Sequence, residues 1–400
     1  MPRPNSRIIT VIVTALVAFG AISTDLYLPS LPAIGLQFEA SAGSVQLTLS
    51  VFLVGFAVSQ LVYGPLSDRF GRRPVLLAGL ALYLAASLAC AMADGLTFLI
   101  IARFCQAVGA CAGVVLGRAI VRDLHEPAQA AKVLSYIATA MALAPALGPI
   151  LGGYVEAWFG WRANFLILAA FGGLTWLACI ALLPETNRRP NPEATRLSRS
   201  LAIYRELAAH PLYRGYVLVC SFAYSGIFAF ISGSSFLLID VLGLAPERFG
   251  LCFAAVVAGY MLGAFASGRL TLRLGLERLV AVGAIVSMLA GLLAAAFTLL
   301  AEPTVLGLIG PVFLFLIGAG LMLPNAMAGA MGPFPDRAGA ASALLGFVSM
   351  AFAAGLGILV GQLHDGSGRS MTFTIAAVGL GAALTVRVMA RHRMERLKTP

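Results

Sequence analysis

Long apolar runs separated by short polar segments make up almost the whole chain. Residues 45–63 and 75–92 are two of these runs, and comparable ones recur from residue 8 onward. A helix needs about 20 apolar residues to cross the hydrocarbon core of a bilayer, so a chain of this length has room for about twelve such helices. The runs are continuous rather than alternating, which excludes a membrane β-barrel. The pattern predicts an all-α polytopic membrane protein.

The composition agrees with this prediction, and the positions of the charged residues indicate how the protein is oriented in the membrane. Of the 400 residues, 60% are hydrophobic and 11% are charged, an apolar fraction too large for a soluble core to hide. All except four of the 27 lysines and arginines fall in segments expected on one side of the membrane. The exceptions are Arg103, inside a helix, and Arg162, Arg248 and Arg369, in the opposite loops. By the positive-inside rule, both termini are expected in the cytoplasm, and the net charge of +10 does not indicate a nucleic-acid partner.

One long polar segment, residues 184–213, interrupts the apolar pattern. It is rich in proline, arginine and serine, and a short amphipathic helix is expected in it near residues 201–209. We interpret this segment as a cytoplasmic linker between two bundles of membrane helices, residues 1–183 and 214–400.

The short polar segment at residues 64–74 carries the strongest chemical signal. It places an acid, three arginines and two glycines between two apolar runs, and these residues are Gly64, Asp68, Arg69, Gly71, Arg72 and Arg73. The pattern predicts a tight cytoplasmic turn between antiparallel helices, in which the glycines allow the backbone to turn. Arginine alone would set the topology, so the added acid at fixed spacing favours a mechanical role. A topology signal alone is the alternative.

The second half of the chain repeats this segment weakly. Gly268 and Gly275 bracket Arg269 and Arg273 at the same spacing of seven, with Leu272 at the position of the acid. Parallel six-helix repeats predict such an echo.

Two ionisable residues, Asp25 and Arg103, fall in apolar helices expected at residues 8–28 and 96–120. Such groups are costly in a bilayer and are functional candidates for that reason. Gln106 lies three residues after Arg103, on the same helical face. Both Asp25 and Arg103 are expected in the outer half of the membrane, where they can approach each other. The alternatives are an interfacial acid at a frayed helix end and an arginine that snorkels toward the surface.

The fifth apolar run is unusually rich in proline and glycine. Small residues at positions 144, 148 and 152 form one stripe at four-residue spacing, which allows another helix to approach closely. Helix packing alone is one interpretation of this stripe. The residues that define the stretch are Pro145, Gly148, Pro149, Gly152 and Gly153.

These stretches resemble motifs of the major facilitator superfamily. Residues 64–73 resemble the signature between its second and third helices. The stretch from Asp25 through Tyr27 to Pro32 resembles the first-helix signature of its 12-helix drug:proton antiporters of the bicyclomycin/chloramphenicol-resistance (Bcr/CflA) type. Residues 144–153 resemble the fifth-helix motif of exporters, departing only at Ala144.

The resemblance implies 12 transmembrane helices in two six-helix bundles and assigns roles to several residues. Asp68 and Arg72 would form a conformational latch, with Asp123 as the acid that meets Arg72. The alternative for Asp123 is a solvated helix end whose arginines only set the topology. Arg103 with Gln106 resembles the fourth-helix motif of the proton antiporters, in which the arginine is implicated in proton coupling. Our own hypothesis is that Asp25 binds the proton and that Arg103 and Gln106 modulate this binding.

The implied function is proton-coupled efflux of amphipathic drugs, such as chloramphenicol or bicyclomycin, by alternating access in a bacterial inner membrane. The alternative is an importer or exporter of a small metabolite on the same fold. The expected partners are the drug, protons and the lipid bilayer; the chain is expected to be a monomer, with the proton gradient in place of a cofactor. Four residues of the second half are candidates to line a cavity, with ordinary packing as the alternative: Tyr224, Phe228, Tyr260 and Asn325.

Enzymatic functions find no support in the sequence. Phosphate binding by a P-loop requires a Gly-x-x-x-x-Gly-Lys-Ser/Thr stretch, and neither Lys132 nor Lys398 lies in one. The four histidines lie near loops or helix ends, and the six cysteines lie in apolar helices. We therefore expect no metal site, no disulfide and no catalytic nucleophile.

Overall fold

A computed structural model of the chain describes residues 6–187 and 190–398. Arg3, Arg188 and Arg189, three of the arginines expected on the cytoplasmic side, lie outside the described residues. The described part is helical, and no strand is found in it.

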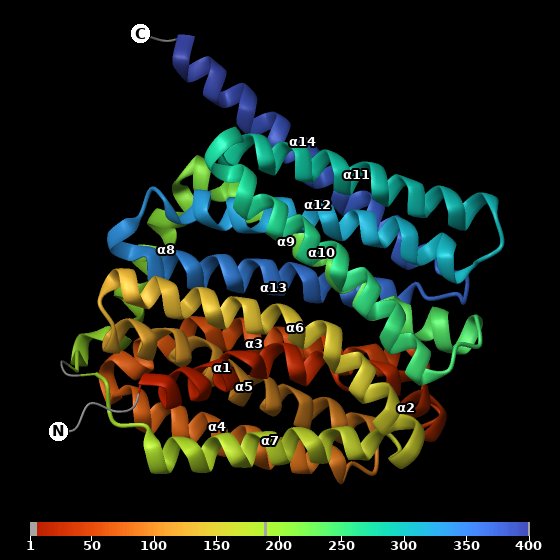
Figure 1. The fold of residues 1–400 in the computed structure, drawn as a ribbon, viewed down its shortest axis with the longest axis horizontal. Coiled ribbons are helices and arrows are strands. Elements are labelled where there is room, and N and C mark those ends of the chain that lie inside the picture. The colour runs from red at the N-terminus through yellow and green to blue at the C-terminus, as the bar shows by residue number, and fades with distance from the viewer. Residues whose placement is uncertain (1–5, 188–189, 399–400) are drawn as a thin grey trace. The chain divides into compact units, whose positions relative to one another are not determined.

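The first half of the chain forms long helices joined by short turns (Figure 1). Their bounds are α1 Ser6–Asp25, η1 Leu28–Ser30, α2 Leu31–Gln37, α3 Ala42–Phe70, α4 Arg72–Ala91, α5 Leu96–Leu124, α6 Pro127–Phe159 and α7 Trp161–Leu182. The linker contains η2 Pro192–Thr195 and α8 Leu197–Ala209.

The second half has the same character. Its elements are α9 Pro211–Ser235, the π-helical η3 Phe236–Val241, α10 Pro246–Leu274, α11 Leu276–Leu300, α12 Val305–Met331, η4 Pro335–Arg337, α13 Ala338–Gln362 and α14 Arg369–Lys398.

Eleven segments of the described chain are long and apolar enough to cross a membrane. The remaining long helix, α6, spans 33 residues, and the side chains of many residues in its first half lie outside the description. The structure thus shows a polytopic all-helical membrane protein, while the count of twelve spans remains a prediction.

The chain divides into two compact units. Unit 1 comprises residues 1–40, 47–200 and 246–251, and unit 2 comprises residues 41–46, 201–245 and 252–400. In unit 1, α4 packs against α5 and α7, and α1 packs against α5 and α6. In unit 2, α11 packs against α12 and α14, and α9 packs against α13 and α14.

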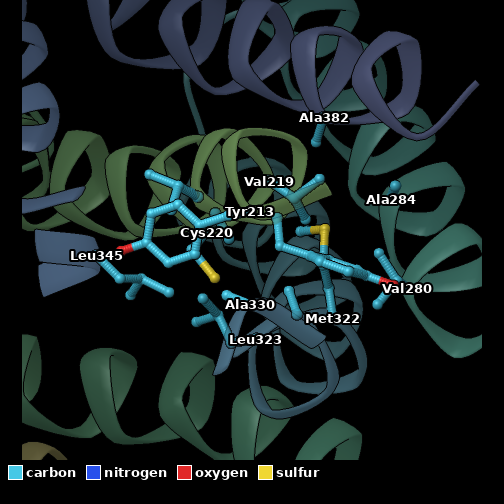
Figure 2. Close-up of a cluster of buried hydrophobic side chains, with 14 of the residues drawn as sticks. Tyr213, Val219, Cys220, Val280, Ala284, Met322, Leu323, Ala330, Leu345 and Ala382 are labelled. Carbon is cyan, nitrogen blue, oxygen red and sulfur yellow. The ribbon is translucent and has the colours of Figure 1, made fainter. Parts of the chain in front are cut away.

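The core of unit 2 is a cluster of buried side chains from α9, α11, α12, α13 and α14 (Figure 2). Tyr213, Cys220 and Met322 lie in it, together with the small residues Ala284 and Ala382. Leu207 of α8 also belongs to this core, and Ile203 and Tyr204 pack against it. Part of the apolar side of the predicted linker helix is therefore covered by protein, whereas Leu201 is exposed.

The first membrane helix differs from the prediction of residues 8–28. It ends at Asp25, and the chain continues through the short helices η1 and α2. Pro29 and Pro32 occupy their first turns, where a missing backbone N–H costs no helical hydrogen bond.

The prediction of a turn over residues 64–74 is wrong for most of its length. The helix α3 continues through Gly64 and Pro65 to Phe70, and only Gly71 interrupts the backbone before α4. Gly71 adopts a φ of +97°, a conformation that favours glycine. Gly64 is helical and makes no turn. Pro65 directly after it does not end the helix, because membrane helices tolerate proline within them.

Candidate functional site

Arg103 is fully buried in unit 1, on α5. Its Nη1 donates to the carbonyl oxygen of Ser23 on α1 at 3.0 Å and to Oε1 of Gln106 at 2.5 Å. Gln106 in turn donates from Nε2 to Oγ of Ser87 on α4 at 2.8 Å. The guanidinium therefore does not snorkel, and it links three helices through polar contacts.

Aromatic rings cover the rest of the guanidinium. Its Cζ lies 4.2 Å from the ring centroid of Tyr27, 4.3 Å from that of Phe52 and 5.8 Å from that of Phe165. Such contacts stabilise a buried cation through the negative faces of the rings. The Nε and Nη2 atoms of Arg103 have no hydrogen-bond partner among the described residues. The Tyr27 hydroxyl is hydrogen-bonded to Oγ1 of Thr48 at 3.0 Å, which fixes the ring beneath Arg103.

Asp25 is buried at the end of α1, with 3% of its surface exposed. Its Oδ1 accepts a hydrogen bond from Oγ1 of Thr24 at 3.0 Å. None of the ion pairs in the described part of the chain involves Asp25 or Arg103. The structure therefore buries both groups without pairing them with each other.

The glycines of α6 explain how Asp25 is held apart from Arg103. A Cβ atom at Gly148 would lie 3.0 Å from Cβ of Asp25, and one at Gly152 would lie 1.7 Å from the carbonyl oxygen of Leu26. Asp25 and Leu26 thus pack on the small-residue stripe of α6, while Ser23 contacts Arg103. Pro145 and Pro149 lie within the same helix, and Gly153 is buried on it.

The predicted latch residues meet at the junction of α3, α4 and α5. Nη1 of Arg72 lies 2.5 Å from Oδ1 of Asp68, at the end of α3, and 2.6 Å from Oγ of Ser67. Nε of Arg72 lies 3.0 Å from Oδ2 of Asp123, at the end of α5. One guanidinium therefore bridges two carboxylates on two helices.

The neighbouring arginines take other partners. Arg69 donates from Nη1 to Oγ1 of Thr195 in the linker at 2.7 Å. Arg73 donates from Nη2 to the carbonyl oxygen of Ile180, near the end of α7, at 2.8 Å. These two hydrogen bonds connect the α3–α4 junction to the end of α7 and to the linker that follows it.

The four cavity candidates all lie in unit 2. Asn325 on α12 is buried, and its Nδ2 donates to Oγ of Ser267 at 2.7 Å and to the carbonyl oxygen of Leu321 at 2.8 Å. Its Oδ1 accepts from Oγ1 of Thr271 at 3.0 Å, so its amide joins α10 to α12. Three half-buried rings complete the set, with two of them beside the core cluster: Tyr224, Phe228 and Tyr260.

Sequence reasoning missed a second polar group on the same stripe of α6. Glu156 lies eight residues after Gly148, and its Oε2 accepts a hydrogen bond from Oγ of Ser30. Asn164 on α7 donates from Nδ2 to Oγ of Ser30 at 2.9 Å and to the carbonyl oxygen of Gly152 at 3.3 Å. The i, i+4, i+8 spacing from Gly148 to Glu156 was the available signal. Phe52 and Phe165 could not be identified from the sequence, because nothing in the sequence distinguishes them from the other apolar residues.

Comparison with known proteins finds relatives along almost the whole chain. The model of the family described as Major Facilitator Superfamily matches residues 12–358. A protein named bicyclomycin resistance protein homolog, from Haemophilus influenzae, is 31% identical over 372 residues, covering 92% of this chain and 91% of that protein. Multidrug resistance protein D of Escherichia coli (strain K12) is 32% identical over 346 residues, covering 86% of each.

A solved structure supports the same fold. The xylose transporter XylE from E. coli, in a partially occluded inward open conformation, matches with a TM-score of 0.73 at 14% sequence identity. The match covers 96% of this chain and 97% of that one. At this identity the likeness shows the fold alone.

Proposed function

We propose that this chain, which belongs to the major facilitator superfamily, exports amphipathic drugs from the cytoplasm in exchange for protons. Proteins of this family and fold are membrane transporters, and the relatives above carry names of drug resistance. The observation that carries the proton-coupled part is Asp25, a carboxyl group buried in a membrane helix without an ion-pair partner among the described residues.

Asp25 is the proton-binding group in this proposal. A charged carboxylate in the hydrocarbon region is costly, by up to the roughly 2.5–3.5 kcal/mol that insertion scales give at a helix centre, and proton binding removes that charge. The group can therefore alternate between a charged form in contact with water and a neutral form shielded from it. Proton binding at Asp25 competes with substrate binding, and this competition couples the two fluxes.

Arg103 positions the end of α1 in this cycle. It holds the carbonyl oxygen of Ser23, two residues before Asp25, and its own place is fixed by Gln106 and the aromatic rings. A change in charge at Asp25 is transmitted along this short segment to α5. The Arg72 bridge between Asp68 and Asp123 acts as the latch on the cytosolic side.

The substrates we propose are neutral or zwitterionic amphiphiles such as bicyclomycin and chloramphenicol, because Asp25 must serve both cargo and proton. The name of the Haemophilus influenzae relative supports bicyclomycin as a candidate, and that of the Escherichia coli relative supports drugs more generally. The protein acts as a monomer, with both termini in the cytoplasm, needs no cofactor beyond the proton gradient and catalyses no chemical reaction. Exchange of a small metabolite on the same scaffold is the second candidate.

Drug accumulation in cells that express the chain, with and without a protonophore, tests this proposal. Expression is expected to lower accumulation, and the protonophore is expected to restore it. Asp25→Asn should abolish the dependence of transport on pH, whereas Glu302→Gln, at an exposed position between α11 and α12, should leave it unchanged. Unchanged pH dependence in Asp25→Asn would exclude Asp25 as the coupling group. A rise in accumulation would favour the metabolite carrier.

A further inference from the structure

The break between α3 and α4 leaves backbone groups without helical partners. The first N–H groups of a helix have no carbonyl within the helix to bond, and Gly71 has no side chain to cap them. The helix α4 also begins with Arg72 and Arg73, two positive charges at the positive end of a helix dipole. This helix start therefore needs an anionic acceptor from elsewhere in the chain.

Glu185, which follows α7, supplies that acceptor. Its Oε1 accepts a hydrogen bond from the backbone N–H of Arg72 at 2.9 Å, and its Oε2 accepts one from that of Arg73 at 3.0 Å. The same Oε1 accepts from the backbone N–H groups of Thr186 at 2.9 Å and Asn187 at 2.8 Å. One carboxylate thus gathers four backbone donors from two segments.

Gly71 is required by this arrangement as well as by its backbone conformation. A Cβ atom at Gly71 would lie 2.6 Å from Oε2 of Glu185. A side chain at position 71 would therefore displace the carboxylate from its place against the start of α4.

The two residues after Glu185 hold the ends of α3 and α5. Asn187 donates from Nδ2 to the carbonyl oxygens of Ser67 at 3.2 Å and Asp68 at 3.0 Å, in the last turn of α3. Thr186 donates from Oγ1 to Oδ2 of Asp123 at 3.2 Å, the same oxygen that Arg72 contacts. We call Glu185, Thr186 and Asn187 the clasp, since they contact all three helices of the latch.

We propose that the clasp positions Arg72 for its bridge between Asp68 and Asp123, and that transport depends on it. This inference rests on the proposed function, in which that bridge is the cytosolic latch. Glu185 fixes the backbone of Arg72, Asn187 fixes that of Asp68, and Thr186 fixes the carboxylate of Asp123. The clasp itself touches neither proton nor drug in this assignment, so its residues are positioning residues.

The decisive variant is Glu185→Gln in the full-length protein, reconstituted in proteoliposomes with an imposed pH gradient. Glutamine keeps the size but loses the charge and cannot accept all four hydrogen bonds. Loss of a helix cap shifts a conformational equilibrium by about fivefold, so we expect the maximal rate of drug transport to fall about fivefold. The KM for the drug should stay constant. Glu193→Gln is the matched control, because Glu193 lies in the same linker and pairs only locally, with Arg196.

A double variant separates positioning from general stability. In an Asp68→Asn background the Arg72 bridge is already broken, so Glu185→Gln should reduce transport no further. If Glu185→Gln lowers the transport rate by the same factor in the parent protein and in Asp68→Asn, the proposal is overturned and the role of the clasp is purely structural. Asn187→Ala, which keeps the charge of Glu185, should lower the rate in the same background-dependent way and serves where Glu185→Gln does not fold.

Hydrogen exchange distinguishes failure of the clasp from failure of the proposed function. The amides of Arg72 and Arg73 should exchange about fivefold faster in Glu185→Gln than in the parent protein, whether or not the protein exports a drug. Unchanged exchange would overturn the clasp even if proton-driven export is established. Faster exchange in a protein that moves no drug would instead support the clasp and refute drug export.

Discussion

Gly152→Ala is the most informative single change in the seam between α1 and α6. The added Cβ would lie 1.7 Å from the carbonyl oxygen of Leu26 and 2.7 Å from its carbonyl carbon. Both neighbours are backbone atoms, so no side-chain rotation relieves the overlap. Restoring an ordinary contact of 3.4 Å or more moves the end of α1 away from α6 by more than an ångström.

Two opposing effects set the size of the change. Alanine is favoured over glycine inside a helix by about 0.5–1 kcal/mol. Overpacking at a tight contact costs about 1–3 kcal/mol. The expected net effect is a loss of up to about 2.5 kcal/mol. Transport should fall about tenfold, because Asp25 directly precedes Leu26 and moves with it.

Thermal unfolding in detergent and drug transport in proteoliposomes measure the two effects separately. Gly355→Ala is the matched control, since Gly355 is an exposed helical glycine on α13 with no atom within 4 Å of an added Cβ. That change should raise stability by about 0.5–1 kcal/mol and leave transport unaltered. If Gly152→Ala behaves like this control, the end of α1 does not pack on α6 as described.

Three further changes probe the neighbouring contacts. Arg103→Lys keeps the charge but loses the planar group that lies against the rings, so transport in proteoliposomes should fall about tenfold; activity equal to the parent would contradict this. Phe52→Leu removes one ring at a cation–π contact that contributes about 0.5–2 kcal/mol, and the thermal midpoint should drop, which an unchanged midpoint would disprove. Asn164→Leu removes the hydrogen bonds that Asn164 donates to the Ser30 hydroxyl and to the Gly152 carbonyl oxygen, but it also removes the unpartnered Oδ1 of Asn164, so we expect a loss of only about 1 kcal/mol in thermal unfolding.

Hydropathy and charge were enough to predict the helices and the membrane, because both follow from local composition. The same local reasoning failed at Gly64 and Pro65, which lie inside α3. In water such a pair ends a helix, whereas in a bundle neighbouring helices satisfy or shield the freed backbone groups. Only Gly71, whose positive φ marks a real break, separates the two helices.

The surroundings of Arg103 were not predictable from the sequence. Gln106 was found because it lies one helical turn away, a distance fixed by the helix itself. Phe52 and Phe165 come from other helices, and the sequence does not distinguish them as contacts of Arg103 from the other members of the 24 phenylalanines. The pairing of Asp25 with Arg103, which their shared depth in the membrane allowed, is absent because Gly148 and Gly152 draw the end of α1 toward α6.

A glycine separates two helices once in each half of the chain, at Gly71 and at Gly275. Comparison of the two junctions shows why a carboxylate from a distant segment caps the helix after Gly71 but not the helix after Gly275. Gly275 between α10 and α11 has φ +80° and ψ 154°, close to the φ +97° and ψ 153° of Gly71. The helix after Gly275 carries its own acid, Glu277, in its first turn, and no atom lies within 4 Å of a Cβ at Gly275. The helix after Gly71 begins with Arg72 and Arg73, so the negative charge that its dipole favours comes from Glu185. Arg72 and Arg73 thus place positive charge at the start of α4, and the carboxylate of Glu185 in the clasp compensates for that charge.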